Sequence, residues 1–167
     1  MYRGRCEAVG AESGMTGTPS ISVRFAEEAD VEWCVLTATF ASPEFARQQP
    51  GVRELIVAER DGTLVGLLIV DYLWAGLPHP IPSMSFVNVL REHQRLGAGR
   101  EMLGFTEKHL RRRGHRLLMS SCTVDEPEPQ AWHRHVGFQD CGYWAGVPFA
   151  DMKGEVFFYK HLVGEAA

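Results

Sequence analysis

Two glycines, Gly97 and Gly99, lie two residues apart in the stretch QRLGAG, where an apolar run ends and a helical pattern begins. The first N–H groups of a helix have no intrahelical partners, and the helix dipole makes that end positive. Glycines there leave room for a close ligand, so successive backbone amides can point at a phosphate or pyrophosphate. Because glycines before helices also occur in plain turns, the pair alone leaves both interpretations open.

The same stretch does not match the motifs of nucleotide-binding loops. Met102 stands where GxGxxG would need its third glycine, and the GK[ST] ending of a P-loop is absent. Mononucleotide-binding loops are therefore disfavoured.

The elements on either side must position this glycine pair. A strand is predicted over 83–89, directly before it, and a helix after it as far as about Arg113. Three arginines followed by Gly114 are a standard helix end, and Arg111, Arg112 and Arg113 are expected to be solvated. The face of this helix turned to the core is predicted to consist of Met102, Leu103, Thr106 and Leu110.

The N-terminal half predicts a strand at 21–25 and an amphipathic helix within 26–40, followed by a short helix or loop. Two β-rich runs, 54–60 and 63–73, flank Asp61-Gly62 and predict a hairpin. Glu54 and Glu59 in this hairpin are expected to be exposed. No regular element is expected in AGLPHPIP, which has three prolines within five residues.

The C-terminal half predicts a strand in HRLLMSS, a break at EPEP, a two-turn helix ending at Gly137 and two final strands. Helices thus interleave with strands that include one hairpin. The predicted fold class is α/β or α+β, with a mixed central sheet of about six to seven strands and flanking helices.

Length and composition fit one soluble globular domain. The chain has 167 residues, a formal net charge of −4 and a hydrophobic fraction of 45%. It lacks the net positive charge that is typical of nucleic-acid binders. It also lacks an apolar run of about 18 residues that could span a bilayer. A flexible tail is expected over 1–19, a single domain over 20–163 and a short tail over 164–167, with Met1 or Met15 as the start.

The four cysteines form no CxxC pair and fit neither a zinc site nor a disulfide framework. Because no signal peptide is visible, a cytoplasmic protein with reduced thiols is expected. Cys122 is interpreted as a small buried residue rather than a nucleophile. His133 and His135 are two residues apart, so they do not share a helix face, and no metal site is expected.

Several segments in the correct order resemble the GNAT acetyltransferase superfamily. VLREHQRLGAG is similar to its acyl-CoA-binding motif Q/R-x-x-G-x-G/A, with Val89 five residues ahead of Gln94 and the glycines at 97 and 99. VRFAEEADVEWC resembles the first strand and helix entry, IVAERDGTLVG the next two strands, AWHRHVGF the segment ending in GF, and FFYKHL the closing strand. The resemblance covers about residues 21–162.

This resemblance implies a GNAT acyl-CoA N-acyltransferase fold, with acetyl-CoA lying between the strand that ends at Val89 and the following helix. Backbone amides from about Leu96 to Arg100 would hold the pyrophosphate. The pantetheine arm would fill a gap between two splayed strands and pair with the backbone near Val87 and Val89, where an N–H can polarise the thioester carbonyl. The implied coenzyme-binding set is Val87, Val89, Gln94, Arg95, Leu96, Gly97, Ala98, Gly99, Arg100 and His133.

The resemblance also indicates candidates for the proton transfers. His133 occupies the place where many relatives carry an acidic tyrosine, so it is a candidate general acid; the alternative is that it only contacts the coenzyme. Ser83 stands where the histone-type branch has a glutamate base, and serine cannot act as a base unaided. Asn88 could orient a substrate or a water, and an ordered water is the remaining candidate for the base.

Loop residues that rim the acceptor site in this fold are mainly apolar and aromatic, which favours a small amine with an apolar or aromatic part. A homodimer contact is the competing explanation for the same loops. These residues are Trp74, Leu77, His79, Pro80, Pro82 and Phe149.

The predicted function is transfer of an acetyl group from acetyl-CoA to such an amine. The alternatives are a non-catalytic acyl-CoA-binding or regulatory module, and an acyltransferase with another acyl donor or a hydroxyl acceptor.

Overall fold

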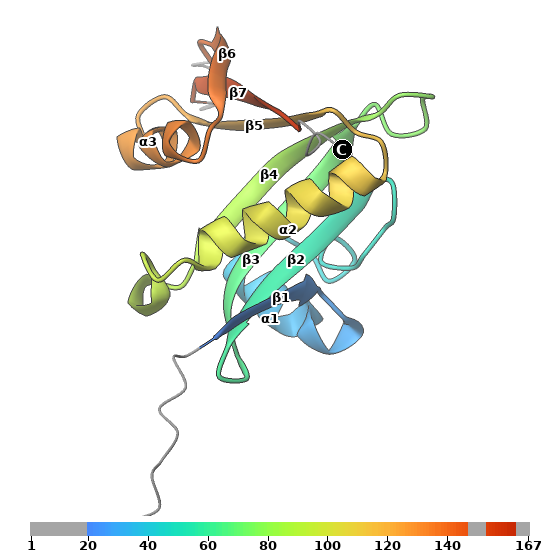
Figure 1. Cartoon of the computed structure of the whole chain (residues 1–167), viewed down its shortest axis with the longest axis vertical. Coiled ribbons are helices and arrows are strands. Elements are labelled where there is room, and N and C mark those ends of the chain that lie inside the picture. The colour runs from blue at the N-terminus through green and yellow to red at the C-terminus, as the bar shows by residue number, and fades with distance from the viewer. Residues whose placement is uncertain (1–19, 147–152, 163–167) are drawn as a thin grey trace, which may run out of the picture.

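The computed structural model describes residues 20–146 and 153–162. Seven of its strands form one mixed sheet in the order β1-β2-β3-β4-β5-β7-β6 (Figure 1). Neighbouring strands are antiparallel except for β4 and β5, which are parallel. The predicted fold class is confirmed. The strands are β1 (Ile21–Phe25), β2 (Arg53–Arg60), β3 (Thr63–Leu73), β4 (Ile81–Val89), β5 (Leu117–Thr123), β6 (Gln139–Trp144) and β7 (Glu155–His161).

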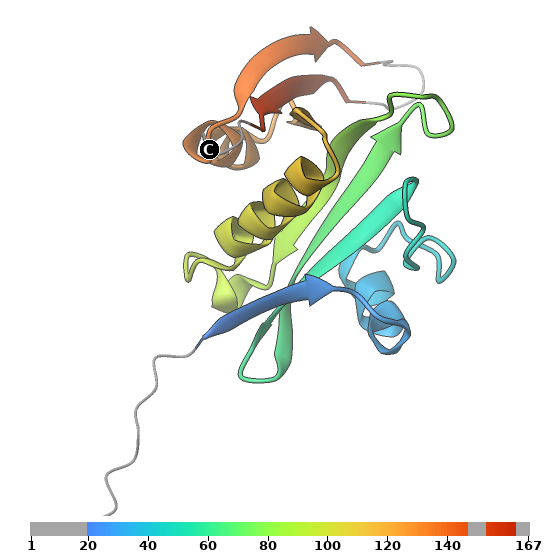
Figure 2. The same cartoon turned by 45° about the vertical axis from the view of Figure 1, so that its right-hand side comes forward.

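Helices cover both faces of the sheet. The long helix α2 lies across one face, and the short helix α1 lies on the other, as Figure 2 shows. The structure therefore has two hydrophobic cores, one on each side of β2 and β3. The helices are α1 (Val31–Thr37), α2 (Ala98–Arg112) and α3 (Pro127–His135), with 3-10 turns η1 (Glu28–Asp30) and η2 (Arg91–His93) ahead of α1 and α2.

The central hairpin forms as the sequence predicts. Asp61 and Gly62 both have positive φ, 51° and 76°, which suits a two-residue turn between twisted strands. Leu55 and Val57 pack on the α1 side, whereas Ile56 and Ala58 pack on the α2 side. Because both faces are covered, the middle of β2, Leu55–Ala58, is an uninterrupted apolar run rather than an alternating one.

Two expectations based on proline were wrong. Pro82 is the second residue of β4 and pairs with Tyr72 of β3, because proline is tolerated at the start of a strand. Pro127 is the first residue of α3, where a helical N–H has no partner to lose and the fixed φ suits the helix. The EPEP segment thus begins the helix instead of breaking the chain.

The exposed position expected for Glu54 was also wrong. Glu54 is only 4% exposed, and its carboxylate accepts hydrogen bonds from Tyr72, at 2.9 Å, and from Arg113 at the end of α2. The Nε2 atom of His109 lies 3.1 Å from the same carboxylate. Arg113 therefore ties α2 to the sheet and is not simply a solvated helix end.

The strands β4 and β5 separate soon after they meet. Their register contains only two pairs, Ser83 with Met119 and Met84 with Ser120. Beyond Met84, β5 turns away to join β7 and β6, so β4 runs on without it (Figure 1). This separation leaves the β5-facing edge of β4 unpaired from Ser85 to Val89 within the part of the chain that is described.

Candidate active site

The N-terminus of α2 lies directly beyond the unpaired edge of β4. Gly97 caps the helix with φ of 99°, and no side chain caps the first turn. The side-chain amide of Gln94 donates a hydrogen bond to the carbonyl oxygen of Val89 at 3.0 Å, which holds the connecting loop against the end of the strand. Arg95 has φ of 60°, a conformation uncommon for residues other than glycine.

The two glycines have different reasons to be glycine. Gly97 needs its left-handed conformation, in which a side chain would be strained. Gly99 has no such conformation, and a Cβ built there would meet Trp132 at 3.6 Å, which is an ordinary contact. The fold therefore does not require glycine at position 99. Room for a closely approaching ligand, such as a pyrophosphate, does account for it.

Basic side chains surround this helix end. Arg91, Arg95 and Arg100 are exposed around the first turn, and Arg100 Nη2 lies 3.1 Å from His135 Nε2. Together with the positive end of the helix dipole, these groups favour an anion with several charges.

Consecutive residues of β4 at the gap point to opposite faces of the sheet. Val87 and Val89 turn their side chains toward the core under α2, so their backbone forms the strand edge at the gap. Asn88, between them, points to the opposite face and pairs in register with Leu67 of β3. An extended ligand in the gap can hydrogen-bond to this edge as an added strand would.

His133 is held firmly behind β5. It is 3% exposed, and its ring stacks on Phe158 with centroids 4.8 Å apart. Its Nδ1 donates to the carbonyl oxygen of Pro129 at 2.7 Å, and its Nε2 lies 2.8 Å from Ser120 Oγ. Burial lowers the pKa of His133, which favours the neutral ring.

Ser120 links His133 to the point where the strands separate. Its Oγ lies 3.0 Å from the carbonyl oxygen of Met84, and Met84 and Ser120 are the last pair between β4 and β5. The serine has one hydroxyl proton for two acceptors, so its direction depends on whether Nε2 of His133 carries a proton.

A polar group that the sequence did not indicate lies on the α1 face at the same place. Ser85 is exposed and lies 2.5 Å from Asp71, whose other carboxylate oxygen accepts from Arg53 at 2.6 Å. Ser83, the position that departs from the glutamate pattern, pairs in register with Asp71. No sequence signal identifies this group, because its three residues come from three strands.

Aromatic rings adjoin this group. Phe40 makes edge-to-face contacts with Phe45 and Phe86, with centroids 5.6 and 5.4 Å apart. The Arg53 guanidinium lies 3.4 Å from the centre of the Phe45 ring. Phe40 is 62% exposed, so this apolar surface is open to solvent.

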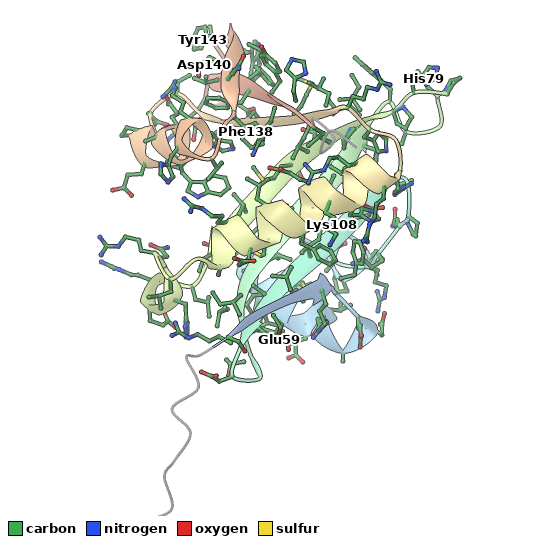
Figure 3. All side chains as sticks on the ribbon, viewed as in Figure 1. Glu59, His79, Lys108, Phe138, Asp140 and Tyr143 are labelled. Carbon is green, nitrogen blue, oxygen red and sulfur yellow. The ribbon has the colours of Figure 1, made fainter. Side chains whose placement is uncertain are left out.

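Four of the predicted rim residues lie on the loop between β3 and β4, namely Trp74, Leu77, His79 and Pro80, whereas Pro82 lies in β4. Trp74 is 65% exposed, and His79 is exposed at the outer end of the loop, where Figure 3 labels it. Phe149 lies outside the described residues. The structure brings the rim loop to the start of β4 and not against the α2 N-terminus.

Two further expectations concern metal and thiol chemistry. Within the described ranges, no group of three or more potential ligands is placed to hold a metal ion. Burial raises the pKa of the Cys122 thiol, which opposes formation of a nucleophilic thiolate. No helix in the described part of the chain is long and apolar enough to cross a membrane.

Comparison with solved structures shows the same fold in several acetyltransferases. A ribosomal-protein-alanine N-acetyltransferase from Brucella melitensis is 23% identical, with a TM-score of 0.68, over 84% of this chain and 99% of that one. The ribosomal-protein-S18-alanine N-acetyltransferase from Escherichia coli is 14% identical, with a TM-score of 0.70, over 88% and 97%. A putative acetyltransferase from Salmonella typhimurium, solved with acetyl-CoA, is 19% identical, with a TM-score of 0.69, over 89% and 97%.

The curated proteins contain no match to this chain. A family profile described as acetyltransferase (GNAT) family does match, over residues 22–138. That range holds the hairpin, β4, the glycine pair and α3, so it contains every part of the gap and of the helix end described above. The chain therefore belongs to the GNAT acetyltransferase family.

Proposed function

We propose that the protein transfers an acetyl group from acetyl-CoA to the nitrogen of a small amine by direct attack. The observation that carries the proposal is the uncapped N-terminus of α2 after Gly97, which opens onto the unpaired edge of β4. The acetyl-CoA bound by the Salmonella typhimurium protein of the same fold supports the choice of acyl donor. When bound, acetyl-CoA supplies an activated acyl thioester.

Each part of the chain then has a binding task. The amides of Ala98, Gly99 and Arg100 hold the pyrophosphate, with Arg95 and Leu96 completing the loop around it. The β4 edge at Val87 and Val89 pairs with the extended pantetheine arm. A backbone N–H of this edge polarises the thioester carbonyl and stabilises the negative charge that develops on its oxygen.

His133 contributes by its position. As a neutral ring that donates from Nδ1 to Pro129, it carries no proton on Nε2 to give away. It holds Ser120 beside Met84, where the arm of the coenzyme ends. A role as general acid requires Nε2 to be protonated first and the proton to pass through Ser120.

The acceptor is proposed to be an amine with an apolar or aromatic part. Phe40 and Phe86 form exposed apolar surface on the acceptor side, and Asn88 is available to orient the amine or a water. Trp74 adds a second exposed ring on the rim loop. Pairing of two copies through the rim loop is the alternative use of this surface. The free cysteines Cys34, Cys122 and Cys141 fit a reducing, cytoplasmic location.

The test combines calorimetric titration of acetyl-CoA with thiol release against a panel of small amines, from alkyl to arylalkyl, and the corresponding alcohols. Binding together with release of the thiol and formation of the acetylated amine is expected. Binding of acetyl-CoA without turnover on any acceptor would indicate a non-catalytic acyl-CoA-binding module instead of an enzyme. Turnover on alcohols alone would make the acceptor a hydroxyl. Absence of acetyl-CoA binding would refute the proposal.

A variant tests the acid role of His133. His133→Phe keeps the ring stacked on Phe158 but removes both nitrogens. An acid role predicts a loss of about 10²-fold in kcat with little change in coenzyme affinity. Unchanged turnover would exclude that role and would show that the hydrogen bond between His133 and Ser120 is not needed for the chemistry.

A further inference from the structure

A bulge in β4 turns one side chain out of the strand pattern. Ile69 of β3 pairs with Phe86 and Val70 pairs with Met84, so Ser85 is an extra residue with no partner across the strands. Phe86 packs on the α1 side and Met84 packs on the α2 side. Bulges of this kind re-aim side chains, and this one places the Ser85 hydroxyl in solvent on the α1 face.

The direction of the Ser85 proton follows from its partner. Ser85 Oγ lies 2.5 Å from Asp71 Oδ2, and an ionised carboxylate can only accept, so the serine donates. Arg53 Nε donates to the other oxygen, Oδ1, at 2.6 Å, and its guanidinium rests against the Phe45 ring. Asp71 is thereby fixed in one orientation. The lone pairs of the exposed Ser85 oxygen are left free to accept a proton.

The position of Ser85 along β4 matches the end of the gap. It is the first residue after Met84, where the pairing with β5 stops, and Val89 lies four residues, or about 13 Å, further along the strand. Met84 and Ser120 share the α2 face with His133, whereas Ser85 and Asp71 share the α1 face. The hydroxyl is therefore at the end of the gap, on the side opposite His133.

We propose that Ser85 and Asp71 form a proton relay that takes the proton from the attacking amine. This inference rests on the proposed function. The bound ammonium gives one proton to Ser85 Oγ while the serine proton moves to Asp71 Oδ2. The freed amine nitrogen then bonds to the acyl carbon, the carbon–sulfur bond breaks, and the departing thiolate takes up the second proton from that nitrogen. Asp71 returns its proton to solvent, so the balance is ammonium plus thioester to amide, thiol and one proton.

The surroundings of the relay suit an amine. Phe86 follows Ser85 directly, and Phe40 and Phe45 continue the same wall. Aromatic faces attract cations, so an ammonium with an apolar body can settle against them before it loses its proton. Arg53 keeps the Asp71 carboxylate in place when the proton arrives and leaves.

The first experiment compares steady-state kinetics of the full chain and its variants on the best amine of the panel. Asp71→Asn keeps the shape but cannot accept the proton, and Ser85→Ala removes the hydroxyl. We expect kcat to fall about 10²-fold in the first and about tenfold in the second, where a water can fill the space. Ser85→Thr keeps the hydroxyl and is expected to retain most of the activity.

The matched control is Asp140→Asn, which makes the same chemical change in an exposed ion pair with Arg134. It should leave kcat unchanged. Coenzyme affinity by calorimetry should be the same in all variants, because the relay does not hold acetyl-CoA. In Asp71→Asn, kcat/KM should keep rising with pH toward the pKa of the amine, since only amine that has already lost its proton reacts.

A second measurement tests the geometry without turnover. In a Ser85→Cys variant, the Asp71 charge should disfavour the thiolate, so alkylation of residue 85 by iodoacetamide should speed up when Asp71→Asn is added. Peptide mass spectrometry separates this site from the native cysteines. Equal alkylation rates would overturn the proposed contact.

The outcomes distinguish the relay from the function on which it rests. If the unaltered chain turns over amines and Asp71→Asn does so with the same kcat and the same pH profile, the relay is refuted while the function stands. If the unaltered chain binds acetyl-CoA but acetylates no amine, the proposed function fails and the relay fails with it.

Discussion

At the scale of single residues, Gly99 is the position where ligand and fold make different demands. A Gly99→Ala change should leave the fold intact, because the new methyl group meets only Trp132 at an ordinary distance. It should weaken acetyl-CoA binding at least tenfold, measured by calorimetry, because the methyl group occupies the space proposed for the pyrophosphate.

Gly104 provides the matched control on the same helix. A Cβ there meets nothing within 4 Å, and the residue is exposed. Gly104→Ala should stabilise the protein by about 0.5–1 kcal/mol through helix propensity and leave coenzyme affinity unchanged. Equal effects of the two substitutions on affinity would show that position 99 provides no room that the coenzyme needs.

His133 should make the stability of the protein depend on pH. Burial lowers its pKa in the folded chain below the ordinary value of about 6.5. The stabilisation is therefore complete above about pH 6.5 and is lost as the pH falls toward the folded-state pKa, by at most about 1.4 kcal/mol per pH unit. His133→Phe should remove this part of the dependence in urea unfolding measured at several pH values.

The same experiment has an internal comparison, because burial also lowers the pKa of His115. The His133→Phe protein should keep the contribution of His115 and show a shallower acid slope than the unaltered chain. Identical slopes in the two proteins would contradict the neutral, buried state assigned to His133.

At the scale of elements, the end of α2 is fastened to the sheet through Glu54. Arg113→Ala leaves a buried carboxylate with fewer partners and should cost about 1–3 kcal/mol of unfolding free energy. Arg111→Ala, which removes only an i,i+4 pair with Glu107 on the same helix, should cost about 0.3–0.5 kcal/mol. Similar losses of unfolding free energy in the two variants, measured by urea unfolding, would contradict the stabilising role of the Arg113–Glu54 contact.

The sequence predicted elements well where a local pattern decides the structure. The hairpin around Asp61 and Gly62 and the buried face of α2 follow from periodicity and turn chemistry. Pro82 and Pro127 were misjudged, because proline breaks an element only in its interior and the position within an element depends on where that element begins.

Residues that meet across strands could not be predicted in the same way. Glu54 is buried because Arg113, which is 59 residues away in the sequence, reaches it. Asp71 meets Ser85 only because a bulge shifts the register of β4 by one residue. A single sequence contains no signal for either register, whereas the glycine pair and the position of His133 lie within continuous motifs.

At the scale of the whole molecule, the gap between β4 and β5 can be reached from both faces of the sheet. The helix end at Gly97 and the His133–Ser120 pair lie on the α2 side, whereas Asp71, Ser85 and the aromatic wall lie on the α1 side. Figure 2 shows these two helices on opposite faces of the sheet. The gap between β4 and β5 joins the two sides. Donor and acceptor can therefore enter from opposite faces and meet at Ser85 without competing for space.

The most direct test of this arrangement is amide hydrogen exchange of the full chain with and without acetyl-CoA. Protection should increase at Val87 and Val89 of β4 and from Leu96 to Arg100, because these amides are the proposed ligands of the coenzyme. Amides of α1 should be unaffected. Protection that leaves residues 87–100 unchanged, or that appears over α1 instead, would contradict the account.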